Sequence, residues 1–170
     1  MKTATLIGCL AVALAAGGCG GGSATPIATN TSTSRTASDP TAELNAAVRD
    51  TLQKNYELSG YVLWHNSVPA SAQQSTRGPA LAGLKASAAQ RRKSGIRIKP
   101  VGGRLTIVSV SIDPSFTRAT AVTLASGHVR PYEDGKAEPK TIAVHERARV
   151  QLRRLGGSKK FVVWQVTVLK

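Results

Sequence analysis

The segment TIAVHERARVQLRRL, residues 141–155, decides the fold of this chain. Its apolar and polar side chains alternate, which is the pattern of a β-strand with one buried face. Glu146 falls on the apolar face of this predicted strand, whereas His145 falls on the other. Three arginines share the face of His145: Arg147, Arg149 and Arg153. The apolar face consists of Ile142, Val144, Ala148, Val150 and Leu152.

Three more segments predict strands on either side of this one along the chain. They are GRLTIVSVSID (103–113), FTRATAVTLASGHV (116–129) and KFVVWQVTVLK (160–170). In the first of them the alternation changes phase between Ile107 and Val108, which indicates a β-bulge. The separators DPS, PYEDGKAEP and GGSK have the composition of turns. We therefore expect a four-stranded antiparallel meander.

Two helices are predicted before the strands. The first opens with Asp39 as a cap and Pro40 at the first helical position, carries an apolar stripe, and has Gly60 as a plausible stop. The segment 61–64 is either an extension of this helix or a short buried strand. The second helix lies within 77–95, with Pro79 near its start and Gly95 after its end. Helices followed by strands predict an α+β domain with the helices packed on one face of the sheet.

The N-terminus predicts an export signal. A short basic region and an apolar run precede Gly17, Gly18 and Cys19, and the run is too short to span a bilayer, which needs about 20 residues. The sequence AAGGC resembles the lipobox of bacterial lipoproteins, which implies diacylation of Cys19. Two acyl chains hold a protein stably on a membrane, whereas one does so only marginally. An ordinary secretory signal with an incidental cysteine is the alternative.

These features divide the chain into three parts. Residues 1–18 form the predicted signal peptide, and residues 19–38 form the lipidated cysteine and a flexible tether rich in Gly, Ser and Thr. Residues 39–170 form the folded domain, which has the size of a single core. Cys9 lies in the removed segment, so we expect neither a disulfide nor thiolate chemistry in that domain. Glycosylation of the tether is a further possibility.

The order of elements resembles the nuclear transport factor 2-like, cystatin-like cone fold. The resemblance rests on RRKSGI at the end of the second helix, TRATAV in the second strand and WQVTV in the last. With the lipobox, the whole chain resembles small secreted lipoproteins of high-GC Gram-positive, actinobacterial type. The resemblance implies a curved sheet that wraps around a helix and leaves a cone-shaped cavity. Some members, such as ketosteroid isomerases, act on apolar substrates with Asp, His or Tyr; others are ligand-binding, scaffold or dimerisation modules.

Candidate catalytic residues are few. Glu146 lies on the apolar face, so it points towards the expected cavity, and His128 or Tyr132 could assist it in acid–base chemistry. Alternatively, Glu146 sits near the rim of the sheet or forms a structural bridge with Arg130 or Arg118, and His128 lies at a loop edge. Metal and nucleotide motifs are absent from the sequence, so we expect no metal and no cofactor.

The formal net charge of +14 indicates an anionic partner or environment. Nucleic acid is not expected, because the chain is exported and has few aromatic residues to stack on bases. Anionic lipid or a phosphate-bearing wall polymer is the simpler partner, although the charge could serve solubility alone. The candidate anion-binding residues are Arg91, Arg92, Lys93, Arg147, Arg149 and Arg153.

The sequence thus predicts a lipid-anchored protein on the extracytoplasmic side of the cell membrane. Its domain is expected to act as a non-catalytic module that binds a ligand or a protein. The apolar small molecule would lie in the cone, and the anionic membrane or wall polymer would lie near it. The alternatives are a small cone-fold enzyme, and an accessory subunit of an envelope machine that forms a homodimer.

The lipid anchor yields the first prediction. Replacement of Cys19 by Ala removes the acylation site but leaves the apolar export signal, so Cys19→Ala protein is secreted and no longer retained on the membrane. Fractionation of cells into membrane and medium measures this. Full membrane retention of the variant would contradict the lipoprotein assignment.

Overall fold

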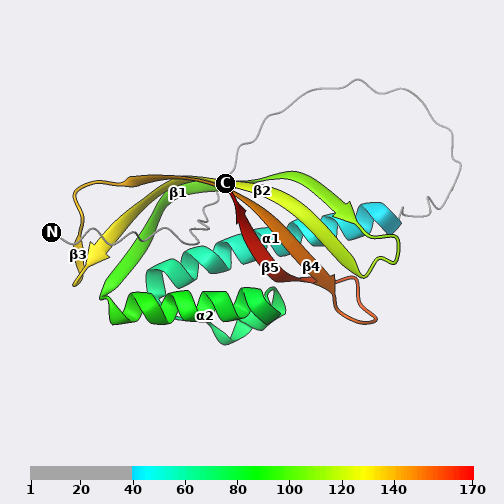
Figure 1. Cartoon of the computed structure of the whole chain (residues 1–170), viewed down its shortest axis with the longest axis horizontal. Coiled ribbons are helices and arrows are strands. Elements are labelled where there is room, and N and C mark those ends of the chain that lie inside the picture. Colours follow the sequence, from blue (N-terminus) through cyan, green and yellow to red (C-terminus); the bar gives the residue numbers. More distant parts are fainter. Residues whose placement is uncertain (1–39) are drawn as a thin grey trace, which may run out of the picture.

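The computed structural model describes residues 40–170. The predicted signal peptide, Cys19, the tether and the expected cap Asp39 lie outside the described residues. The chain folds as an α+β domain, with two helices packed on one side of an antiparallel sheet (Figure 1). The elements are α1 (Pro40–His65), the short 3₁₀ helix η1 (Ala70–Gln74), α2 (Gly78–Lys93), β1 (Ile96–Ile112), β2 (Arg118–Glu133), β3 (Lys136–Ala137), β4 (Ile142–Arg154) and β5 (Phe161–Leu169).

The four predicted strands are present, in the order β1-β2-β4-β5. A fifth strand, β3, pairs with the end of β2 and comes from a segment that we expected to be a turn. The first strand begins earlier than predicted, because residues 96–100 pair with the last part of β2. The bulge predicted in this strand is confirmed, since the register passes from Ile107 directly to Ser109.

The first helix is longer than Gly60 suggested. Gly60 is buried within α1, and the segment 61–64 continues the helix, which settles the choice left open by the sequence. The stop comes at Asn66, which adopts a positive φ of 51° and donates its backbone N–H to the carbonyl of Val62 at 3.0 Å. Asn is one of the few residues that tolerates this left-handed conformation after a helix.

The alternation predicted for residues 141–155 is confirmed. Val144 and Val150 are buried, whereas Arg147 and Arg149 are exposed. Ile142, expected on the buried face, is 54% exposed because it begins β4 at the end of the sheet. The main core lies between α1 and the buried face of the sheet and includes Leu44, Val48, Leu52, Ala121, Val150, Leu152, Phe161 and Val163.

The strands β1 and β2 approach each other very closely at three glycines. A Cβ placed on Gly127 would lie 2.1 Å from the carbonyl oxygen of Gly102. On Gly103 it would lie 3.0 Å from the hydroxyl of Tyr56, a buried α1 residue. A second register shift, between Pro100 and Gly102, falls at the same place. Because bulges bend strands, β1 can curve here over the helices (Figure 1).

The turn between β1 and β2 depends on Asp113. Its Oδ1 atom accepts the backbone N–H groups of Thr117 at 2.8 Å and of Arg118 at 3.0 Å. The bond from Arg118 is the largest of the causes that lower the pKa of Asp113 to about 2. This confirms the turn role that the Asp-Pro sequence indicates.

The glycine crossing yields the second prediction. Gly127→Ala forces a methyl group into the backbone of β1, so we expect the free energy of unfolding to fall by about 3 kcal/mol. Chemical denaturation followed by circular dichroism measures it. Gly83→Ala is the control, because nothing lies within 4 Å of a Cβ at that helical position. It should gain about 0.5–1 kcal/mol. Equal stability of the Gly127→Ala variant and the unchanged protein would contradict the close crossing.

Candidate binding cavity and basic sheet face

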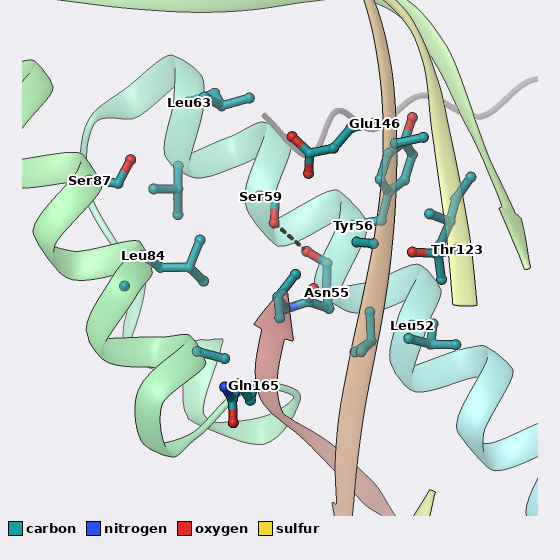
Figure 2. A pocket seen from close by; sticks show the side chains of 18 of the residues that line it. Leu52, Asn55, Tyr56, Ser59, Leu63, Leu84, Ser87, Thr123, Glu146 and Gln165 are labelled. Atoms are coloured by element: carbon teal, nitrogen blue, oxygen red, sulfur yellow. Dashed lines mark hydrogen bonds between the residues drawn. The ribbon is translucent and has the colours of Figure 1, made fainter. Parts of the chain in front are cut away.

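A cavity of about 500 Å³ lies between α1, α2 and the buried face of the sheet (Figure 2). Its volume falls within the roughly 300–1,000 Å³ of small-molecule sites. The apolar walls come from every layer of the domain. They include Leu52, Val62, Leu63, Pro79, Leu84, Leu105, Ala125, Ala148, Val150 and Val166.

Several polar side chains of the cavity already have protein partners. Ser59 donates its hydroxyl to the carbonyl of Asn55 at 2.9 Å, and Asn55 donates its side-chain amide to the hydroxyl of Thr76 at 2.7 Å. The first of these bonds is drawn in Figure 2. Because these groups are satisfied within the protein, the cavity favours an apolar occupant.

Glu146 lines the cavity, as its place in the alternation of β4 predicted. The register sets it opposite Ala125, which is buried, and Ser59 and Tyr56 of α1 line the same cavity (Figure 2). Neither Arg118 nor Arg130, the two arginines considered for a structural bridge, lies opposite Glu146. Arg118 pairs with Arg153, and Arg130 pairs with Lys99.

The expected partners of Glu146 lie elsewhere. His128 pairs with Ala143 and is exposed on the opposite face of the sheet, so the hypothesis of a His128–Glu146 pair is wrong. Tyr132 packs edge-on against Trp64 with ring centroids 5.1 Å apart, and it is not among the residues that line the cavity. The structure therefore brings only Glu146 of the three candidates to the cavity.

Arg91 is not on the surface, although we expected it to be an exposed anion-binding residue. It is 7% exposed and lines the cavity. Its guanidinium donates from Nε to Asn66 Oδ1 at 3.0 Å, from Nη1 to Ser87 Oγ at 2.6 Å and from Nη2 to the carbonyl of Val62 at 3.2 Å. Burial lowers the pKa of Arg91. This residue ties α2 to the end of α1 instead of extending a surface patch.

Asn66, which the sequence pattern does not single out, completes this junction. Besides ending α1, its side chain accepts from Arg91 and donates from Nδ2 to the carbonyl of Ile96 at 2.7 Å. Three elements, α1, α2 and β1, thus meet at one side chain. Its position after the predicted first helix and before Pro69 could have indicated the helix end, because Asn favours this cap conformation.

Tyr56 also lines the cavity, and the sequence pattern does not single it out. It is 2% exposed, and its hydroxyl has no hydrogen-bond partner among residues 40–170. Burial raises its pKa to about 12, so the phenol stays neutral. Because the hydroxyl lies against Gly103, this side chain supports the crossing of β1 and β2 while its ring forms part of the cavity wall.

The exposed face of the sheet is basic. Cross-strand pairing places Arg104, Arg118, Arg147, Arg149 and Arg153 on it. Among the paired residues of β1, β2, β4 and β5, no acidic residue shares this face. Arg118 lies directly opposite Arg153, a like-charge pair that destabilises a sheet. Arg92 and Lys93 are exposed at the end of α2, on the helical side of the sheet.

Arg153 is held by an aromatic ring. Its guanidinium lies 3.8 Å from the ring centroid of Trp164, in the range of a cation–π interaction. Gly78 approaches the same ring so closely that a Cβ there would lie 2.9 Å from it. Trp164 therefore contacts both Arg153 and the start of α2, and it fixes one arginine of the basic face.

No helix within residues 40–170 is long and apolar enough to cross a membrane. In the same range, His, Asp and Glu side chains form no group of three that could hold a metal ion.

Comparison with solved structures shows the fold. The chain is similar to the intermembrane space region of the chloroplast protein ARC6, with a TM-score of 0.62 and 12% sequence identity. The match covers 73% of this chain and 95% of that one. No protein-family profile matches the sequence, and neither does any curated protein. The class defined here is thus an α+β domain with a cavity between its helices and its sheet.

Proposed function

We propose that this protein is a lipid-anchored envelope protein that binds an apolar small molecule in its cavity without transforming it. The observation that carries the proposal is the cavity of about 500 Å³ with apolar walls. Burial of an apolar ligand in it is favourable by roughly 25 cal/mol per Å² of apolar surface removed from water. The predicted diacylated Cys19 would keep the domain beside the membrane, where apolar molecules concentrate.

The nuclear transport factor 2-like cone is part of this proposal. It is supported by a bent sheet, by helices on one face only, and by a cavity between the two layers. The structural similarity to the ARC6 region agrees with an α+β fold of this kind of layering and carries no functional information at 12% identity.

An enzymatic alternative keeps one supporting observation, the presence of Glu146 in the cavity. General acid–base catalysis usually needs a second titratable group within reach. His128 and Tyr132 are both outside the cavity, and Tyr56, which lines it, has its pKa raised to about 12 by burial and stays a neutral phenol. We therefore favour the non-catalytic role.

The cavity yields the third prediction. Ala148 lines it from β4, and Ala148→Phe fills part of its volume, so we expect the affinity for an uncharged apolar fluorescent probe such as N-phenyl-1-naphthylamine to fall by at least tenfold. The matched control is Ala143→Phe, the same change on the exposed face of the same strand. Titration of the soluble Cys19→Ala chain measures both, with circular dichroism to confirm folding. Equal loss in the two variants would contradict the cavity as the binding site.

The same preparations separate binding from catalysis. Glu146→Gln removes the carboxylate and leaves the shape of the side chain. We expect the bound apolar ligand to be recovered unchanged from both proteins. Recovery of a chemically altered ligand from the unchanged protein, and of intact ligand from Glu146→Gln, would establish the enzyme instead.

We further propose that the basic sheet face lies against anionic lipid or wall polymer. Each Lys or Arg near an anionic bilayer contributes about 1 kcal/mol. The fourth prediction is that Arg147→Ala/Arg149→Ala, in the Cys19→Ala background, weakens binding to vesicles rich in phosphatidylglycerol by roughly 30-fold. Binding should also weaken as salt rises.

The matched change on the helical side tests which basic surface is used. Arg92→Ala/Lys93→Ala removes the same charge, and we expect it to cost less than the change on the sheet. A larger loss from the α2 variant would move the anion site to the helix. A mass that doubles with concentration, unaffected by either variant, would favour the dimerising role instead.

A further inference from the structure

Arg91 is a buried cation in the wall of an apolar cavity. Its three hydrogen bonds go to an amide, a hydroxyl and a backbone carbonyl, all of them neutral groups. Two ion pairs are found within residues 40–170, Lys54 with Asp50 and Lys159 with Glu43. Neither of them includes Arg91. A guanidinium has five N–H donors and these bonds use three of them, so the second N–H of Nη1 and of Nη2 can bind a further group.

Such a charge is expensive to bury. A guanidinium that leaves water without a counter-ion costs several kcal/mol unless other groups compensate. The carbonyl of Val62 lies near the C-terminus of α1, where the helix dipole is negative, and this compensates in part. An anion in the cavity would complete the compensation, because a guanidinium offers parallel N–H donors that fit a carboxylate or phosphate.

We infer that the ligand of the cavity is an amphiphile with one acidic head group, a carboxylate or a phosphate, that pairs with Arg91. This inference rests on the proposed function, since it names the class of molecule that the same cavity binds. The apolar tail would lie along the walls formed by Leu52, Leu84 and Leu105.

The position of Arg91 also orients such a ligand. Ser87, which accepts from Arg91, belongs to α2, whereas Glu146 belongs to β4 in the wall formed by the sheet (Figure 2). An acidic head that pairs with Arg91 is therefore expected on the helical side of the cavity.

The experiment compares three probes with one tail: dodecanoic acid, dodecyl phosphate and dodecanol. They are titrated into the soluble Cys19→Ala chain by competition with the fluorescent probe. We expect one or both acidic probes to bind roughly 10- to 100-fold more tightly than the alcohol, as charge-assisted hydrogen bonds allow. The two acids tell a carboxylate ligand from a phosphate ligand.

Variants then assign the preference. Arg91→Gln should bring the ratio of acid to alcohol affinity close to one, whereas Arg92→Gln, the same change at the exposed neighbour, keeps it. Because Arg91→Gln can also loosen the junction with Asn66, Arg91→Lys serves as a second variant that retains the charge and part of the preference. The ratio within one variant does not depend on its stability.

The outcomes separate the two proposals. If no probe binds, the cavity function itself fails, and the acidic ligand with it. If acid and alcohol bind equally well, the cavity binds apolar molecules and the role of Arg91 is overturned. A preference for acids that survives in Arg91→Gln overturns it as well.

Discussion

The pleat of β4 is the constraint on which the rest of this structure depends. Successive side chains of a strand must point to opposite faces, so a strict alternation commits every second residue to one environment. In β4 the even-numbered residues meet the helices and the cavity, and the odd-numbered arginines meet solvent. A slip of one residue would bury Arg147 and Arg149 and expose Val150. The same pattern thus creates an apolar interior and a basic exterior on a single sheet.

A second constraint holds the helices in place around the cavity. The side chain of Asn66 links the end of α1 to Arg91 of α2 and to the first residue of β1. Since α2 is tied at this end, and contacts Trp164 through Gly78 at the other, space remains between it and the sheet. A charged residue is an unusual choice for such a junction, because an apolar side chain could fill the position at lower cost. That choice is what connects the architecture to the chemistry of the proposed ligand.

The sequence predicted the strands, the bulge at Val108, the start of α2 and the orientation of Glu146, because all of these follow from local periodicity and turn composition. Prediction from the sequence failed where contacts between segments far apart in the chain determine the structure. Gly60 resembles a helix stop, yet it is buried within α1, and only the neighbouring elements make that favourable. Arg91 resembles the basic last turn of a helix, but its contacts come from residues 25 and 29 positions away. His128 and Glu146 needed the hairpin register, which the sequence leaves open.

The central claim is that the cavity holds an amphiphile with an acidic head group in the living cell. Native mass spectrometry of the full-length protein, purified gently from the cells that make it, tests it most directly when compared with the denatured mass. Our account predicts an excess mass that disappears on denaturation and is recovered as a small amphiphile with a carboxylate or phosphate group. Identical native and denatured masses, from protein that is folded and monomeric, would contradict it and leave the basic sheet face as the functional surface.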